Sequence, residues 1–256
     1  MRAWLTRWRE TRTLRKRAIP DPLWHLTLAR FPFLSYRGTA DVARLRDMAT
    51  LFLARKEFTG AQGLAVDDEM AVAIAAQACV PVLELGLSWY DGFVGIVVHA
   101  DAVVAQREVI DDAGVVHEYE EELSGEAMHG GPVMLSWSDV DEAGESAEVG
   151  YNVVIHEFAH VLDMRDGLAD GVPPLADRVA HDAWRQVLTA EYDDFCDRVD
   201  ADEETLLDPY AAEAPEEFFA VAAEAFFVAP QHFLAEHPRM YALLRGFFNQ
   251  DPALHR

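Results

Sequence analysis

Residues 151–167 read YNVVIHEFAHVLDMRDG and carry an HExxH motif at positions 156–160. Asn152 is a residue type that favours the N-cap of a helix, and Gly167 is one that ends helices. Between them an apolar stripe recurs at helical spacing, formed by Val154, Phe158, Val161 and Leu162. The segment is therefore predicted to be a helix that buries one face.

The motif itself indicates a metal site. His156 and His160 are four residues apart, so both imidazoles lie on the same face of a helix and can reach one ion. Zinc binds neutral imidazole and tolerates an open coordination position. Glu157 can accept a proton from a zinc-bound water, whose pKa falls to about 7. The alternative is a pair of ordinary core histidines, but polar groups on a buried helix need partners, which favours the metal.

A catalytic zinc site needs a third protein ligand, and one candidate lies close by. Asp166 follows His160 by six residues, as in the pattern HExxHxxGxxH/D. Asp163, however, stands where that pattern has the glycine that turns the chain sharply, and aspartate reaches positive φ less readily. Asp163 and Asp166 can equally be polar residues at the helix end or partners of a ligand histidine.

Two further candidates lie on a second predicted helix at 214–230, APEEFFAVAAEAFFVAP, with Pro215 at its first position and Pro230 at its end. Glu217 and Glu224 are seven residues apart and share one side of this helix. An acid in the first turn also favours the helix dipole, but that does not account for Glu224. Composition and spacing leave Glu217, Glu224 and Asp166 as alternatives.

The remaining pattern predicts an α+β domain rather than alternating βαβ units, because the strands cluster between helical regions. Helices are expected at 40–57 and at 67–79, the second capped by Asp67. Strands are expected at 95–104, 115–123 and 132–137, with a turn at 111–114. The expected organisation is an arm at 1–20 and one domain at 21–256, with helical, sheet and zinc-site helical parts at 21–80, 81–140 and 150–256.

Charge is unevenly distributed along the chain. The net charge is -24, yet residues 1–17 hold seven of the 21 lysines and arginines and one acid. The acidic excess argues against direct nucleic-acid binding. The basic arm can be an interfacial helix or, as we favour, an arm docked on the acidic body.

Two cysteines and the lack of a signal sequence predict a cytoplasmic protein. The most apolar stretch, 70–98, contains breaks that exclude stable membrane insertion, at Gln77, Pro81, Glu84 and Gly86.

Four stretches resemble the Mlc titration factor A family of bacterial zinc peptidases. They are VLELGLSWYDGF (83–94), GEAMHGGPVMLSWSDV (125–140), GYNVVIHEFAHVLDMRDG (150–167) and DPYAAEAPEEFFAVAAEAFF (208–227). The resemblance covers roughly 40–252. The catalytic part is similar to the metallopeptidase domain of anthrax lethal factor, in which HExxH is followed much later by Tyr-x6-Glu, here Tyr210 and Glu217.

The resemblance implies a zincin-like fold with a small mixed sheet and one zinc ion per chain. It implies His156, His160 and Glu217 as the zinc ligands, Glu157 as general base and Tyr210 as a phenol near the metal. The substrate would be a peptide or protein, with aminopeptidase-like activity expected, bound along an edge strand at 132–137. The family name also implies an Mlc-like transcription repressor as a partner, and the alternative function is to sequester that repressor, with peptidase activity secondary or absent.

Overall fold

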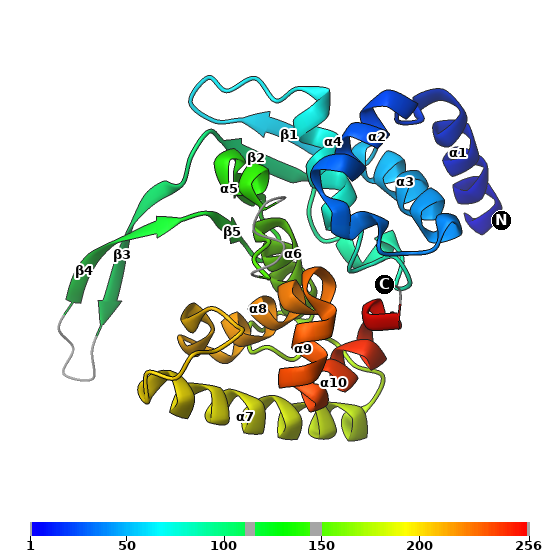
Figure 1. The fold of residues 1–256 in the computed structure, drawn as a ribbon. Coiled ribbons are helices and arrows are strands. Elements are labelled where there is room, and N and C mark those ends of the chain that lie inside the picture. Colours follow the sequence, from blue (N-terminus) through cyan, green and yellow to red (C-terminus); the bar gives the residue numbers. More distant parts are fainter. Residues whose placement is uncertain (1, 111–115, 144–149, 255–256) are drawn as a thin grey trace.

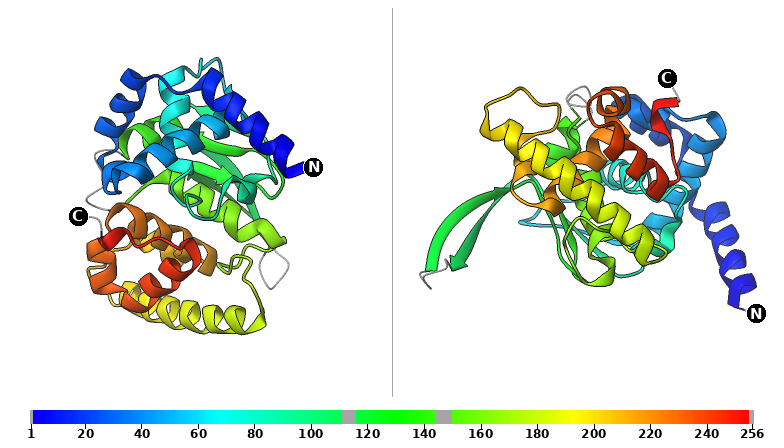
Figure 2. Two further views of the ribbon diagram at one scale, coloured as in Figure 1. Left: turned by 90° about the vertical axis from the view of Figure 1, so that its right-hand side faces the viewer. Right: turned by 90° about the horizontal axis from the view of Figure 1, so that it is seen from below.

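The structure is a computed structural model that describes residues 2–110, 116–143 and 150–254. A small sheet and the N-terminal helices lie on one side of the molecule, and the helices after residue 178 lie on the other (Figures 1 and 2). Helix α6 (Val153–Asp163) runs between these two parts and packs most extensively against α8 (Pro215–Val228). The predicted α+β class is confirmed.

The main sheet is mixed. Its strand order is β1 (Glu57–Gly60), β2 (Gly95–His99), β6 (Val133–Ser136) and β5 (Gly125–Ala127). The first three strands are parallel, and β5 pairs antiparallel with β6. Helix α4 (Asp68–Ala78) connects the parallel strands β1 and β2, so a βαβ unit is present where the sequence pattern suggested none.

The segment expected to provide an edge strand lies inside the sheet instead. β6 pairs with β2 on one side, Ile96 opposite Val133, and with β5 on the other, Gly125 opposite Leu135. Both sides of β6 are therefore hydrogen-bonded, and its edge cannot receive a peptide. The short strand β5, which the sequence pattern did not predict, is the edge strand on this side of the sheet and packs against α6.

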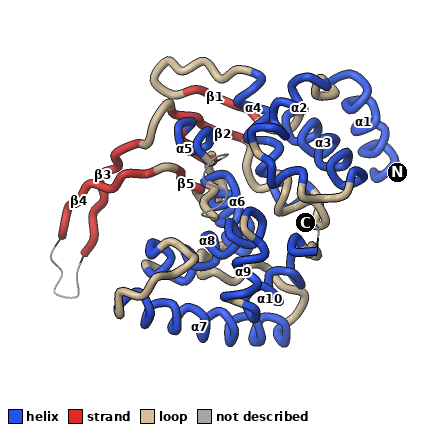
Figure 3. The backbone as a smooth tube through the Cα atoms, viewed as in Figure 1, coloured by secondary structure: helices blue, strands red, loops and turns tan. Residues whose placement is uncertain are grey.

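A two-stranded hairpin extends from the body (Figures 1 and 3). It consists of β3 (Val103–Ile110) and β4 (Val116–Leu123) in antiparallel pairing. The strand predicted at 95–104 is thus two strands, because β2 ends at His99 and β3 belongs to the hairpin. The turn predicted at 111–114 lies outside the described residues.

Two predicted helix ends are wrong. Helix α3 (Thr39–Leu53) stops short of residue 57, because the Glu57 N–H donates to the Val94 carbonyl (3.0 Å) and starts β1. The helix predicted at 214–230 is α8, which ends at Val228. Pro230 is the first residue of the next helix, α9 (Pro230–Glu236). Asp67 does cap α4 as predicted, since its carboxylate accepts the Met70 N–H at 2.9 Å.

The remaining helices complete the two sides of the molecule. They are α1 (Arg2–Arg17), α2 (Asp21–Arg30), α5 (Trp137–Glu142), α7 (Arg178–Asp200) and α10 (Pro238–Phe248). Every residue of α8 from Phe218 to Val228 is buried, so α8 is held on all sides. In the part of the chain that the structure describes, no helix has the length and apolar character needed to cross a membrane.

Candidate metal centre

Helix α6 is fixed at both ends by side chains and backbone that the sequence specifies. The Asn152 side chain accepts the Ile155 N–H at 2.9 Å, and its amide donates to Gln77 at 2.7 Å. After Asp163 a 3₁₀ turn leads to Gly167, whose φ of 99° is accessible to glycine at little cost. The helix therefore starts and stops where the motif requires.

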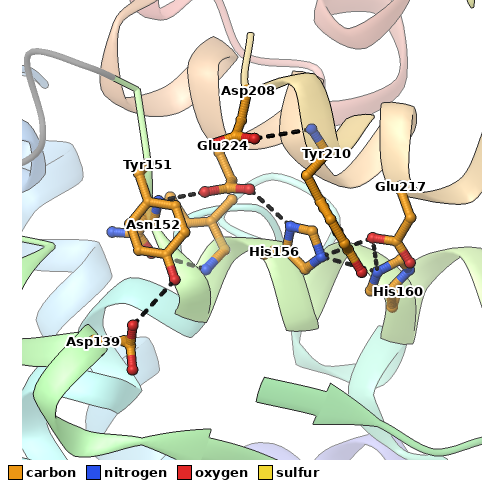
Figure 4. Close-up of polar contacts among 10 residues, drawn as sticks. Asp139, Tyr151, Asn152, His156, His160, Asp208, Tyr210, Glu217 and Glu224 are labelled. Atoms are coloured by element: carbon orange, nitrogen blue, oxygen red, sulfur yellow. Dashed lines mark hydrogen bonds and ion pairs between the residues drawn. The ribbon is translucent and has the colours of Figure 1, made fainter. Parts of the chain in front are cut away.

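The two histidines of the motif meet a glutamate from α8 (Figure 4). The Nε2 atoms of His156 and His160 are 3.1 Å apart. One carboxylate oxygen of Glu217, Oε2, lies 3.1 Å from the first and 3.3 Å from the second. The structure thus brings together one possible ligand atom from each of the three residues, within reach of a single ion.

These atoms fit a zinc ion. Tetrahedral zinc with bonds of about 2.0–2.1 Å holds its ligands roughly 3.3–3.4 Å apart, close to the separations seen here. Two imidazoles and one carboxylate also leave a fourth position open, as a catalytic site requires. Two facing Nε2 lone pairs would repel each other unless a cation or a proton lay between them.

The electrostatics of the cluster agree with a cation site. Burial lowers the pKa of His156, but hydrogen bonds to Glu217 and Glu224 outweigh it and raise that pKa well above its usual value. Burial raises the pKa of Glu217, but hydrogen bonds with His156 and His160 outweigh it and hold that pKa well below its usual range. Protons therefore compete for this site, and metal binding should weaken as the pH falls.

Glu224 contacts the His156 ring on the side opposite to the cluster (Figure 4). Its Oε1 lies 2.8 Å from Nδ1 of His156, and its Oε2 accepts the Asn152 N–H. A carboxylate on Nδ1 keeps a proton there, so Nε2 presents its lone pair to the site. Glu224 is thus buried beside the cluster without contributing an atom to it.

The two aspartates that follow the HExxH motif, Asp163 and Asp166, bind the turn after α6. Buried Asp163 accepts the N–H groups of Asp170 and Gly171 at 3.0 and 2.9 Å. Exposed Asp166 accepts the Leu168 N–H at 3.2 Å. Asp166 therefore lies outside the metal cluster, and both carboxylates stabilise the loop.

Glu157 lies beside the cluster and against strand β5. Its side chain is 4% exposed, and its Oε2 has no hydrogen-bond partner among the described residues. Burial raises the pKa of Glu157 to about 7. A buried carboxylate oxygen without a partner is costly, which indicates a ligand that supplies the missing contact.

Gly125 in β5 sets the position of Glu157, a role that the sequence gave no signal for. A Cβ atom at this position would lie 2.5 Å from Oε1 and 2.6 Å from Cγ of Glu157. Only glycine lets the strand approach the carboxylate this closely.

We expect Gly125→Ala to displace the Glu157 carboxylate and to lower by at least about tenfold the kcat of any reaction in which that carboxylate takes part, since small misplacements of a reacting group cost up to 10²-fold. Gly92→Ala is the matched control, because an added Cβ there has no atom within 4 Å. Steady-state kinetics with the zinc content of each variant checks this. Equal kcat in both variants would show that the Glu157 position is not fixed by β5.

Tyr210 lines a cavity of about 410 Å³, as do His156 and Glu157. Its ring centroid is 6.2 Å from that of His156, it is 39% exposed, and its N–H donates to Asp208 at 2.9 Å. Figure 4 shows its ring pointing toward the cluster. Three carboxylates line the cavity, those of Glu157, Asp208 and Glu224. Among the described residues, no lysine or arginine lines it.

Comparison with known proteins gives a consistent answer. Residues 5–249 match the family described as glucose-regulated metallo-peptidase M90. Mlc titration factor A of Salmonella arizonae is 37% identical over 238 residues, covering 91% of this chain and 92% of the relative. The protein of that name from Cronobacter sakazakii is 35% identical over 250 residues, covering 96% and 92%. An uncharacterised Synechocystis protein is 35% identical over 253 residues, covering 98% and 91%. The chain belongs to the glucose-regulated metallopeptidase family M90.

Proposed function

We propose that this protein is a zinc-dependent peptidase with aminopeptidase-like activity, located in the cytoplasm. His156, His160 and Glu217 would hold one zinc ion per chain, Glu157 would act as general base, and Tyr210 would stabilise the oxyanion. The observation that carries the proposal is the meeting of two Nε2 atoms and one carboxylate oxygen at 3.1–3.3 Å, beside the Glu157 Oε2 atom that has no partner among the described residues.

The residues divide the chemistry of peptide hydrolysis between them. When bound, zinc supplies Lewis acidity, which polarises the scissile carbonyl and acidifies water. Glu157 then accepts a proton from the attacking water and passes it to the leaving amine. Its burial suits this role, because a base whose pKa is near neutral can both take and return the proton. Glu224 holds the His156 ring in place throughout.

The proposed role of the Tyr210 hydroxyl can be tested with Tyr210→Phe. Its hydroxyl would donate a hydrogen bond to the oxyanion that develops on the carbonyl, so Tyr210→Phe should lower kcat by about 10- to 10³-fold with little change in KM. Initial-rate kinetics on one peptide substrate, over a range of concentrations, checks this. A raised KM with unchanged kcat would instead make Tyr210 a substrate-binding residue.

The acidic lining of the cavity supports recognition of a free amino terminus, because Asp208, the lining carboxylate that has no part in the metal cluster or in proton transfer, favours a positive charge there. We expect the zinc-loaded protein to hydrolyse alanine p-nitroanilide and to lose at least about tenfold in kcat/KM on its N-acetylated form, equivalent to 1.4 kcal/mol. A chelator should abolish the activity and added zinc restore it. Equal rates on both substrates would favour endopeptidase activity, and no hydrolysis of any peptide would contradict the peptidase itself.

A second candidate function follows from what the relatives are called. Several are named Mlc titration factor A, and the net charge of -24 suits a basic, DNA-binding partner such as an Mlc-like repressor. The Glu157→Ala protein separates the two functions. If the inactive variant still retains a purified Mlc-like repressor in a pull-down, binding does not depend on catalysis. If neither form retains it, the sequestering function is wrong.

A further inference from the structure

Helix α1 carries two tryptophans on its solvent side. Trp4 and Trp8 are one helical turn apart and are 68% and 50% exposed. The opposite side of α1 packs on α3, where Thr13 and Leu14 are half-buried and Glu10 pairs with Arg55 at 2.6 Å. The indoles therefore take no part in holding α1 on the protein. Adjacent exposed aromatic side chains of this size indicate an interaction surface.

The same helix is strongly basic. Six of its cationic side chains are exposed: Arg7, Arg9, Arg12, Arg15, Lys16 and Arg17. Arg12 lies over the Trp8 ring, with 5.5 Å between its guanidinium carbon and the ring centroid. Helical spacing places Arg12 and Arg15 beside the two tryptophans, whereas the one acid of α1, Glu10, faces α3. Aromatic and cationic groups thus share one exposed face, which we call the Trp–Arg face (Trp4, Trp8, Arg12 and Arg15).

We propose that the Trp–Arg face binds the surface of an anionic lipid bilayer. Indole rings favour the level of the lipid headgroups, and clustered basic side chains attract anionic lipids. A helix with this combination lies in the plane of the interface and does not cross it. The partner must be negatively charged, because residues 1–17 have seven bases against one acid while the rest of the chain is acidic.

The N-terminal end of α1 lies apart from the acidic body. Figure 2 (right) shows its N-terminal end projecting away from the rest of the molecule. Charges separated by more than about 8–10 Å are largely screened at physiological salt. The projecting end can therefore approach a negative surface, while repulsion between that surface and the body is weakened by distance and salt.

Co-sedimentation of the full chain with vesicles tests the proposal. We expect binding to vesicles of phosphatidylcholine with phosphatidylserine, little binding to phosphatidylcholine alone, and loss of binding as salt is raised. Trp4→Ala with Trp8→Ala should weaken binding by about tenfold or more. Arg12→Glu with Arg15→Glu should weaken it by about 20-fold or more.

The controls carry matched changes elsewhere on the surface. Arg178→Glu reverses an exposed charge on α7, and Leu168→Ala removes an exposed apolar side chain. Both should leave vesicle binding unchanged, and all variants should keep the zinc content and the peptide hydrolysis of the parent in solution. The proposal is overturned if the parent does not bind anionic vesicles, or if the Trp–Arg variants bind as well as the controls. Binding of duplex DNA through this face without vesicle binding would assign it to nucleic acid instead.

Discussion

Glu217→Ala should leave the protein folded but strip it of zinc. Glu217 gives the cluster its one carboxylate oxygen, and the two imidazoles alone complete only half of a tetrahedral site. Losing a direct ligand should weaken zinc binding by more than the roughly 10- to 100-fold expected for losing an outer hydrogen-bond partner. Zinc per chain, measured by plasma mass spectrometry after identical dialysis against a weak chelator, should fall from one in the parent to nearly none in the variant.

Two other glutamates of α8, Glu216 and Glu224, provide comparison variants for this experiment. Glu216→Ala removes the adjacent carboxylate, which is outside the cluster, and should keep one zinc. Glu224→Gln removes the carboxylate that holds His156 and should lower affinity by roughly 10- to 100-fold, an intermediate effect. One zinc retained in Glu217→Ala would contradict the proposed ligand set and return Asp166 or Glu224 as the third ligand.

Glu157→Ala should differ from Glu217→Ala, because it should keep zinc and lose only catalysis. Its carboxylate is buried beside the cluster and is the general base that we propose, but it supplies none of the three possible ligand atoms. Removing a general base typically costs about 10²–10⁴ in rate, so kcat should fall by that factor while the zinc content stays at one per chain. Parallel measurements of kcat and of zinc by mass spectrometry check both halves of the prediction.

The nearly isosteric change Glu157→Gln keeps the packing against Gly125 and removes only the ionisable carboxyl group. It should lose activity as Glu157→Ala does, which would separate proton transfer from a packing defect. Glu203→Gln, at an exposed position, is the matched control and should keep full activity. Full peptidase activity in Glu157→Gln would show that another group accepts the proton.

The central part of the site followed from local sequence. The 3.6-residue period of a helix is enough to place His156 and His160 on one face, and the Asn152 side chain caps that helix by accepting the N–H of Ile155, three residues further on. The choice of a third ligand was not local. Spacing left Glu217, Glu224 and Asp166 open, and the family resemblance favoured Glu217. The packing of α8 on α6 then places Glu217 on Nε2 of His156 and Glu224 on Nδ1 of the same ring.

The strands were harder to predict, because their pairing joins distant residues. β5 has three residues, too few to produce an alternating pattern, and β1 continues directly from a helical pattern. Glu57 leaves that pattern because its N–H pairs with Val94. The segment at 132–137 was recognised as a strand, but its sequence could not reveal that strands on both sides cover its edges.

The sequence by itself therefore determined the family, the α+β class, the metal-binding helix and its start. The helix and its start depend on residue type and on spacing within a few turns of chain, and the family depends on four such local motifs in order along the chain. Residue patterns alone left the third carboxylate open, and the tertiary structure brings Glu217, which the resemblance implied, to the two histidines. Only the tertiary structure decided which strand lies at the edge beside α6, and that Gly125 lies against Glu157. Each of these depends on how elements far apart in sequence pack together, and a single strand or helix carries no record of its neighbours in space.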